Sequence, residues 1–396
     1  MRITFHPKLL DCLPTYSRHQ FGKDFASGIT VGVLALPLAM AFAIASGCSP
    51  TAGIWTAIVA GLLTSLCGGS RVQIGGPTGA FIPIVYGIVA AHGFANLLGA
   101  TMLAGAFLLA MGIARMGQLI RFIPVTVVIG FTNGIAVVIF MAQIKDFFGL
   151  RIDNLPAEFF ARIKTLAGAA HTVDLPTLGL AAGCLLFLLS YNRLAQHLAL
   201  LRRAPGPLAV LIAGTLVAWL FELPVETIGS RFNGIPQELP AIGFPPLSIH
   251  DFGKLISPAV TIALLGAIES LLSARVADSQ IDDRHDPNQE LIAQGLANLA
   301  APLFGGFAAT GAIARTTTNV KTGGRTPIAG ILHALVLLGI VLVAAPLAAY
   351  VPLATLSAIV MVVAVNMGEW HEFTELRRYS NNYRIILLAT FFVTVL

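Results

Sequence analysis

The sequence predicts an all-α polytopic membrane protein, and two observations support that fold class. Of the 396 residues, 56% are hydrophobic and only 11% are charged, about half the charged fraction of an ordinary soluble domain. Asp, Glu, Lys and Arg are also absent from the blocks 25–70, 72–114, 122–144 and 326–368. One bilayer crossing takes about 20 apolar residues. The longer blocks therefore each hold two crossings joined by a tight turn, which argues against a soluble protein with buried helices.

Seven membrane segments are expected in the first half of the chain, behind a cytoplasmic N-terminal lead, residues 1–24. Pro37 lies in the middle of the first segment, where it would remove a backbone hydrogen bond and kink or open the helix. Residues 143–175 are expected to form a polar connection on the outer side. The segments of this first repeat, 25–222, are expected at 25–46, 50–67, Thr78 to just before His92, 96–113, 122–142, 176–191 and 205–222.

A Pro-rich outer linker, 223–250, is the natural boundary to a second repeat, 251–396. Asn288-Gln289-Glu290 is expected to cap a helix of this repeat. The last apolar run, 385–396, is about 18 Å long as a helix, against a hydrocarbon core of about 30 Å. We therefore expect a second repeat that is truncated before its last helices. Its elements are expected at 256–276, from Asn288 to Gly305-Gly306, a break at 308–310 with a short helix to Lys321, 326–346, 352–366 and a surface helix over Trp370–Tyr383.

The placement of the basic residues predicts the orientation. When the crossings alternate, most of the 24 Lys and Arg residues fall on the side of the N-terminus. Positively charged connections favour the cytoplasm. We therefore expect the protein to lie in an inner (plasma) membrane, with its N-terminus on the cytoplasmic side. An odd number of crossings per half makes the second half an inverted copy of the first. The net charge of +5 forms no basic stripe, so nucleic acid is not an expected partner.

Two short breaks inside apolar sequence predict the binding site: Gly75-Gly76-Pro77-Thr78-Gly79-Ala80-Phe81 and Ala309-Thr310-Gly311-Ala312-Ile313. Gly permits an unusual turn, and Thr can cap the helix that starts after it. Helix N-termini have free N–H donors and about half a positive charge, so two of them aimed at one cavity favour an anion. The alternative is a kink that serves close helix packing. The expected substrate-binding residues are Thr78, Gly79, Ala80, Thr310, Gly311 and Ala312.

Two ionisable residues, Glu269 and Arg315, lie inside otherwise apolar segments. Charges within the membrane usually face a cavity or each other. We expect Arg315 to add positive charge behind the anion, and Glu269 to bind the coupling cation, a proton or a sodium ion. The alternatives are a structural ion pair between the two residues, or a position of Glu269 so close to the inner membrane interface that water solvates its carboxylate. Thr316, Thr317 and Thr318 either line the same cavity or hydrogen-bond to their own helix.

Motifs of enzyme chemistry do not accompany these residues. The sequence lacks the patterns HExxH, G-x-S-x-G and G-x-x-x-x-G-K-[ST], which would bind zinc, activate a serine or cradle phosphates. Its histidines are dispersed or lie in expected loops, which speaks against a metal site. We therefore expect no catalytic residues, no cofactor and no metal, and neither an enzyme nor an ATP-driven pump.

Five stretches of the chain carry a further signal: Leu36-Pro37-Leu38-Ala39-Met40-Ala41-Phe42-Ala43 with Ala45-Ser46-Gly47, Gly76-Pro77-Thr78-Gly79-Ala80, Gly266-Ala267-Ile268-Glu269-Ser270-Leu271-Leu272-Ser273-Ala274, Asn288-Gln289-Glu290-Leu291 and Thr310-Gly311-Ala312-Ile313-Ala314-Arg315-Thr316. Together these stretches resemble the SulP (sulfate permease, SLC26-type) anion transporters. The resemblance covers essentially the whole chain. It implies seven plus seven inverted segments, with a core of segments 1–4 and 8–11 and a gate of segments 5–7 and 12–14. It also implies that segments 1, 3, 8 and 10 hold the substrate, which adds Leu38 and Phe42 of the first segment to the site. Such proteins usually end in a cytoplasmic STAS domain, which is absent from this sequence.

The function that this resemblance implies is secondary-active transport of small anions across a bacterial inner membrane. The implied substrates are of the sulfate, bicarbonate or C4-dicarboxylate class, with coupling to H⁺ or Na⁺ and an elevator-like movement. Many sulfate-type members carry Gln where this chain has Leu38, which makes the chain more similar to the bicarbonate and C4-dicarboxylate branch. Glu269 stands where bicarbonate relatives have a sodium-binding Asp, and a Glu fits proton coupling better.

Alternatives of the same fold are an anion exchanger, an anion channel and, with less support, a nucleobase permease. A nucleobase permease would want a second acidic group in the segment that holds Arg315. The expected partners are the anion, the coupling ion, membrane lipid and a second copy of the chain in a homodimer.

Overall fold

Two compact units make up the computed structural model, which describes residues 5–118, 124–152, 155–156, 158–197, 205–245 and 252–396. Unit 1 comprises Met1–Ile120 and Pro236–Ala345, and unit 2 comprises Arg121–Ile235 and Pro346–Leu396. Each unit thus combines a stretch from the first half of the chain with a stretch from the second half. This division groups the segments as the implied core and gate do.

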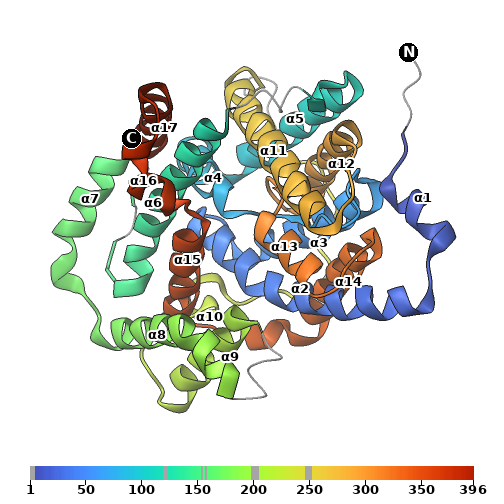
Figure 1. Ribbon diagram of the computed structural model, residues 1–396. Coiled ribbons are helices and arrows are strands. Elements are labelled where there is room, and N and C mark those ends of the chain that lie inside the picture. The colour runs from blue at the N-terminus through green and yellow to red at the C-terminus, as the bar shows by residue number, and fades with distance from the viewer. Residues whose placement is uncertain (1–4, 119–123, 153–154, 157, 198–204, 246–251) are drawn as a thin grey trace. The chain divides into compact units, whose positions relative to one another are not determined.

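Unit 1 consists mainly of helices (Figure 1). It also contains two very short strands, which position the candidate site. The strands β1 (Gly75–Gly76) and β2 (Thr310–Gly311) each precede a short helix, α4 (Ile82–His92) and α13 (Ile313–Lys321). A 3₁₀ turn, η2 (Gly79–Phe81), leads into α4. The other described helices that begin in this unit are α1 (Lys8–Cys12), α2 (Arg18–Ala45), α3 (Pro50–Cys67), α5 (Phe94–Ile113), α11 (Phe252–Ile281), α12 (Pro287–Ala300) and α14 (Pro327–Ala348).

Unit 2 is built around α6 (Val125–Phe148) and α15 (Leu353–Met367), which pack against each other. α17 (Asn381–Val395) also packs on α6, while α8 (Leu175–His197) and α9 (Gly206–Leu220) pack on α15. Its remaining described helices are the short α7 (Phe159–Gly168), α10 (Ile228–Phe232) and α16 (Trp370–Thr374).

The predicted class is confirmed, because six of the described helices are long and apolar enough to cross a membrane. The structure also agrees closely with several expected segments. α3 has the expected bounds, and α5, α14 and α15 begin and end within two residues of the expected positions. Long apolar runs with clear polar or Gly-rich ends are the elements that sequence patterns define best.

α2 differs from its expected segment because it begins at Arg18, inside the expected lead 1–24. The Ser17 side chain caps it by accepting a hydrogen bond from Gln20 N, which satisfies one of the free donors of the first turn. The helix also continues through Pro37 to Ala45, so this Pro does not open it. Pro removes one backbone bond, and here the neighbouring turns keep the helical path.

The start of α2 is anchored to the start of α14 through Asp24, which is fully buried. Its carboxylate accepts hydrogen bonds from Tyr16 Oη at 3.1 Å, Arg325 N at 2.9 Å and Thr326 Oγ1 at 2.6 Å. Burial, together with the nearby Asp24 charge, raises the pKa of Tyr16. The Tyr16 hydroxyl therefore stays a donor, and the buried carboxylate is hydrogen-bonded as such groups must be.

One expected segment is longer than predicted, and two local expectations are wrong. The fifth segment, expected to end at 142, continues as α6 to Phe148, and the polar connection 143–175 also contains α7; residues 153, 154 and 157 fall outside the described part. The surface helix Trp370–Tyr383 is divided into α16, a 3₁₀ turn and the start of α17, which Ser380 caps. Asp286, not Asn288-Gln289-Glu290, caps α12 by accepting from two backbone N–H groups. At Ser380 and Asp286 a side-chain cap decides where the helix begins.

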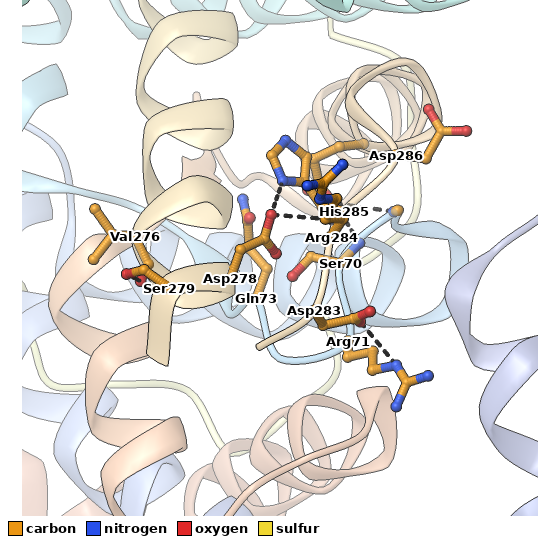
Figure 2. A network of polar contacts seen from close by, with 12 residues as sticks. Ser70, Arg71, Gln73, Val276, Asp278, Ser279, Asp283, Arg284, His285 and Asp286 are labelled. Carbon is orange, nitrogen blue, oxygen red and sulfur yellow. Dashed lines mark hydrogen bonds and ion pairs between the residues drawn. The ribbon is translucent and has the colours of Figure 1, made fainter. Parts of the chain in front are cut away.

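A polar network at the loop between α11 and α12 fixes where the chain enters β1 (Figure 2). Arg71 Nε lies 2.9 Å from Asp283 Oδ2, and the backbone of Asp286 donates to the Gly69 carbonyl at 3.0 Å. His285 donates its backbone N–H to Asp278, and its ring Nδ1 lies 2.6 Å from the same carboxylate. These contacts tie the α11–α12 loop to the turn that precedes β1.

Candidate functional site

The two breaks meet in unit 1 as an antiparallel pair of strands. Gly75 lies opposite Gly311, and Gly76 lies opposite Thr310. One residue further, the Ala312 backbone N–H donates to the Ile74 carbonyl at 2.9 Å. A helix begins just after each strand, α4 by way of η2 and α13 directly. The pairing therefore brings two helix N-termini, far apart in the sequence, to one place.

Side chains of α13 hold the backbone of the first break. Thr316 Oγ1 accepts from Ile74 N at 3.1 Å, and Asn319 Nδ2 donates to the Val72 carbonyl at 2.8 Å. Arg315 Nη2 donates to the Pro77 carbonyl. Arg315, Thr316 and Asn319 lie on one face of the helix because residues three and four apart are neighbours, and all three are buried. The polar side chains of α13 thus hydrogen-bond to backbone groups beside β1 that would pair with a neighbouring strand in a longer sheet.

One face of α11 covers the paired breaks. The Thr310 hydroxyl donates to the Gly266 carbonyl at 2.9 Å, and Gln73 Nε2 donates to the Ser270 carbonyl at 3.1 Å. Ser273 Oγ contacts Thr316 Oγ1 at 3.3 Å. Positions 266, 269, 270 and 273 recur at helical spacing, so Glu269 belongs to this same face. Its Oε2 accepts a hydrogen bond from Thr78 Oγ1 at 2.9 Å.

Gly76 is required by both conformation and space. Its φ is +145°, which L side chains rarely adopt. A Cβ at this position would lie 2.6 Å from Arg315 Nη1, closer than real atoms approach. The guanidinium of Arg315 therefore lies directly against the backbone of β1.

Glu269 and Arg315 act on each other electrostatically across this site. Arg315 is 1% exposed, and its Nη1 has no hydrogen-bond partner among the described residues. Glu269 is partly exposed. Within the described part of the chain no ion pair joins the two side chains directly, so the guanidinium keeps a donor and the carboxylate keeps acceptor capacity for other ligands.

The structure corrects two details of the predicted site. Thr78 occupies the N-cap position of η2 but makes no capping hydrogen bond, and Ala312, not Thr310, precedes α13. Both threonine hydroxyls bond to α11 instead. The Ala312 N–H is already bonded to Ile74, so the free donors at the start of α13 are those of its first turn, beginning at Ile313. Gly79 and Ala80 remain at the start of η2, as expected.

The other predicted residues are placed as follows. Leu38 and Phe42 are each 5% exposed and lie one turn apart on α2, which packs against α4 and α13. Thr318 donates its hydroxyl to the Ala314 carbonyl of its own helix, whereas the Thr316 hydroxyl accepts a hydrogen bond from Ile74 N, just before β1. Sequence reasoning missed Gln73, Ser270 and Asn319. The recurrence of small or polar residues at 266, 269, 270 and 273 was a signal that could have identified the α11 face.

Comparison with known proteins agrees with this arrangement. The profile described as Sulfate permease family matches residues 21–390. The chain is 45% identical to the putative sulfate transporter YvdB of Bacillus subtilis, covering 96% of this chain and 71% of that protein. It is 31% identical to the bicarbonate transporter BicA of Picosynechococcus sp., covering 94% of this chain and 66% of that protein. The chain thus spans about two thirds of the length of such relatives.

Solved structures show the same fold. The transmembrane domain of a cyanobacterium bicarbonate transporter BicA superposes with a TM-score of 0.86 at 31% identity, covering 96% of both chains. The murine anion transporter Slc26a9, in an inward-facing state, gives a TM-score of 0.89 at 19% identity, covering all of this chain and 69% of that one. The inverted-repeat fold expected for the chain is therefore shown.

Proposed function

Because the chain belongs to the sulfate permease family, a family of anion transporters, we propose that it is a secondary-active carrier that binds its anion at the paired breaks. The observation that supports this most directly is the pairing of Gly75–Gly76 with Thr310–Gly311. That pairing places the starts of α4 and α13 side by side. Interrupted helices at corresponding places of two repeats are where transporters hold their substrates.

The electrostatics of the proposed seat favour an anion. Each helix N-terminus has free N–H donors and about half a positive charge. Gly79 and Ala80 supply such donors on one side, and the first turn of α13 supplies them on the other. The guanidinium of Arg315 adds a full positive charge with one donor unused by the described residues. Donors of this kind suit a small oxyanion, because each oxygen can accept several hydrogen bonds.

Glu269 is the proposed site of the coupling cation. Its carboxylate is held by the Thr78 hydroxyl, at the N-cap position of η2, next to the proposed seat. A proton or sodium ion bound there would reduce the negative charge facing the anion, so cation and anion would each strengthen the other's binding. This mutual effect is what symport requires.

The proposed substrate is sulfate, bicarbonate or a C4-dicarboxylate. The relatives YvdB and BicA are named for sulfate and bicarbonate. Leu38 offers no hydrogen bond, so in this proposal backbone N–H groups and Arg315 recognise the anion. The same carrier would lie in a bacterial inner membrane with its N-terminus in the cytoplasm, as its basic connections indicate.

All residues of the proposed seat and of the cation site belong to unit 1. The bound anion would therefore travel with that unit, which supports an elevator-like mechanism. In such a mechanism the seat itself need not be rebuilt during transport, and pairing of β1 with β2 would persist in both access states.

The test is uptake by proteoliposomes that contain the purified full-length protein. Labelled sulfate, bicarbonate, succinate and chloride would be offered with an imposed proton gradient, an imposed sodium gradient or neither. We expect accumulation of at least one anion above its equilibrium level, driven by one of the two gradients. Uptake that only equilibrates would indicate a channel, and uptake that needs an internal counter-anion would indicate an exchanger; either result contradicts the symport proposal.

A further inference from the structure

Asn298 is a fully buried polar residue that the proposed anion seat does not include. It lies near the end of α12 and is 0% exposed. Its Oδ1 accepts a hydrogen bond from the Ala309 backbone N–H at 2.9 Å, and its Nδ2 donates to the Ala309 carbonyl at 2.8 Å. One side chain therefore satisfies both backbone groups of the residue that precedes β2.

These two hydrogen bonds lie on the edge of β2 that faces away from β1. Three residues after Ala309, the Ala312 N–H donates to the Ile74 carbonyl beside β1. Successive residues of an antiparallel strand direct their backbone groups to opposite edges, so those of Ala309 point away from β1. A carboxamide presents one donor and one acceptor side by side. The Asn298 side chain thus takes the place that a third strand would have.

The helix that carries Asn298 is itself held closely in place. A Cβ on Gly105 of α5 would lie 2.7 Å from Leu299 N, and a Cβ on Gly295 of α12 would lie 2.6 Å from Leu109 N. Small residues allow two helix backbones to approach this closely. α12 therefore packs against α5 by direct backbone contact, which gives Asn298 a firm support.

A row of buried polar side chains continues from Asn298 toward the start of α12. Asn298 Nδ2 also donates to the Gln294 carbonyl at 2.8 Å, and Gln294 Nε2 donates to Glu290 Oε1 at 2.9 Å. Glu290 Oε2 in turn accepts from Gly69 N at 3.0 Å, in the turn that precedes β1. Residues four apart share one face of a helix. One face of α12 is therefore bonded to the approaches of both breaks.

Apolar contacts around Ala309 bury it without fixing its register. The side chains of Ala60, Ala297 and Ala309 form a small core cluster. Hydrophobic contact is non-directional, so methyl groups alone leave β2 free to shift along its own axis. The paired hydrogen bonds from Asn298 are directional and select one position. Because α13 begins at Ile313, shortly after Ala309, that position also sets where the first turn of α13 lies.

We propose that Asn298 is a positioning residue of the anion seat. Its amide fixes the register of β2, and through β2 it places the free N–H donors at the start of α13 and the guanidinium of Arg315 on the same helix. Asn298 acts on the anion through this backbone and not by contact with it. The proposal rests on the proposed function, because the seat is the part of the molecule that it positions.

Uptake kinetics of Asn298→Leu in proteoliposomes test the effect on the seat. Leu has a similar volume but cannot hydrogen-bond, so the KM for labelled sulfate, bicarbonate or succinate should rise roughly fivefold, with the maximal rate largely kept. Loss of folded protein alone would lower the maximal rate and leave KM unchanged. Asn133→Leu on α6 of unit 2 is the matched control, since Asn133 is also 0% exposed and donates to a distant backbone carbonyl, that of Glu369. A KM for Asn298→Leu equal to that of Asn133→Leu overturns the proposal.

Hydrogen–deuterium exchange of the anion-free protein tests the hydrogen bonds themselves. The Ala309 N–H should exchange roughly tenfold faster in Asn298→Leu, because its acceptor is removed. Asn298→Ser is the milder variant if Leu prevents folding: its hydroxyl can bond to the Gln294 carbonyl but is too short to pair with Ala309, so the same two changes are expected. Unchanged exchange of the Ala309 N–H in a folded variant overturns the positioning role.

The two measurements also separate this proposal from the proposed function. Faster exchange together with an unchanged KM overturns the positioning role and leaves the anion seat standing. Failure of the wild-type protein to take up any of the labelled anions overturns the seat and the positioning role together. Faster exchange together with a raised KM supports both.

Discussion

The two breaks of unit 1 are equivalent in position but differ in chemistry. After the first break comes α4, whose buried residues are the apolar Ile82, Val85 and Ile88. After the second comes α13, whose buried residues include Arg315, Thr316 and Asn319. α4 packs by burying hydrocarbon, whereas α13 packs by hydrogen bonding to the backbone on either side of β1.

This difference divides two tasks between the repeats. The first break contributes mainly backbone, and the second contributes the side chains that hold that backbone and add charge. Inversion of the repeats requires only that both helices start at the same place. It does not require that their sequences match, so each repeat is free to specialise. Substitutions in the second break should therefore affect both structure and binding.

Arg315→Ala should have the largest effect, because it removes the charge of the proposed seat and leaves the Pro77 carbonyl without its donor. We expect anion affinity to fall about 100-fold, as losing hydrogen bonds to a charged group costs about 2–3 kcal/mol. Affinity would be measured by calorimetric titration with the transported anion. Lys321→Ala is the matched control, since it removes an exposed charge from the same helix. Equal affinity in the two variants would remove Arg315 from the site.

Glu269→Gln should separate coupling from binding. Gln can still accept the hydrogen bond of Thr78 but cannot become charged, so gradient-driven accumulation should stop while the anion still exchanges across the membrane. Proteoliposome uptake with an imposed gradient measures this. Glu226→Gln, at an exposed carboxylate in unit 2, should accumulate normally. Normal accumulation in Glu269→Gln would refute the assigned role.

Gly76→Ala tests whether the close contact between the two breaks is needed. An added methyl group would meet the Arg315 guanidinium at 2.6 Å on a backbone with φ of +145°. Strain of this kind costs about 1–3 kcal/mol, so thermal unfolding should shift to lower temperature. Gly87→Ala on α4 is the control, because a Cβ there meets nothing within 4 Å. A Gly76→Ala protein as stable as Gly87→Ala would contradict the described contact.

The smallest expected effects distinguish the two threonines. Thr78→Val removes a hydrogen bond to the Glu269 carboxylate, and Thr310→Val removes one to the Gly266 carbonyl. Each should cost about 1 kcal/mol, but only Thr78→Val should change the concentration of coupling cation needed for half-maximal uptake. Cation titration of uptake, alongside thermal unfolding, separates the two. Equal cation dependence in both variants would show that Thr78 does not act through Glu269.

Sequence patterns predicted most of the fold because a bilayer makes them simple to interpret. Backbone polar groups in hydrocarbon must bond within their own helix, so apolar length defines α3, α5, α14 and α15 with small errors. Asp286 shows where this reasoning ends. Its capping role depends on backbone geometry at the α11–α12 turn, and several neighbouring residues could have capped the helix equally well.

For the candidate site, the sequence by itself determined that two helices are interrupted and that Glu269 and Arg315 lie among apolar residues. Glycine, proline and isolated charge are visible without coordinates, because each is costly in an unbroken apolar helix. Only the tertiary structure decided that β1 pairs with β2, that Ala312 uses its N–H there and that Arg315 lies against Gly76. Such contacts join residues more than 230 positions apart, and their geometry depends on how whole helices pack, which no local pattern contains.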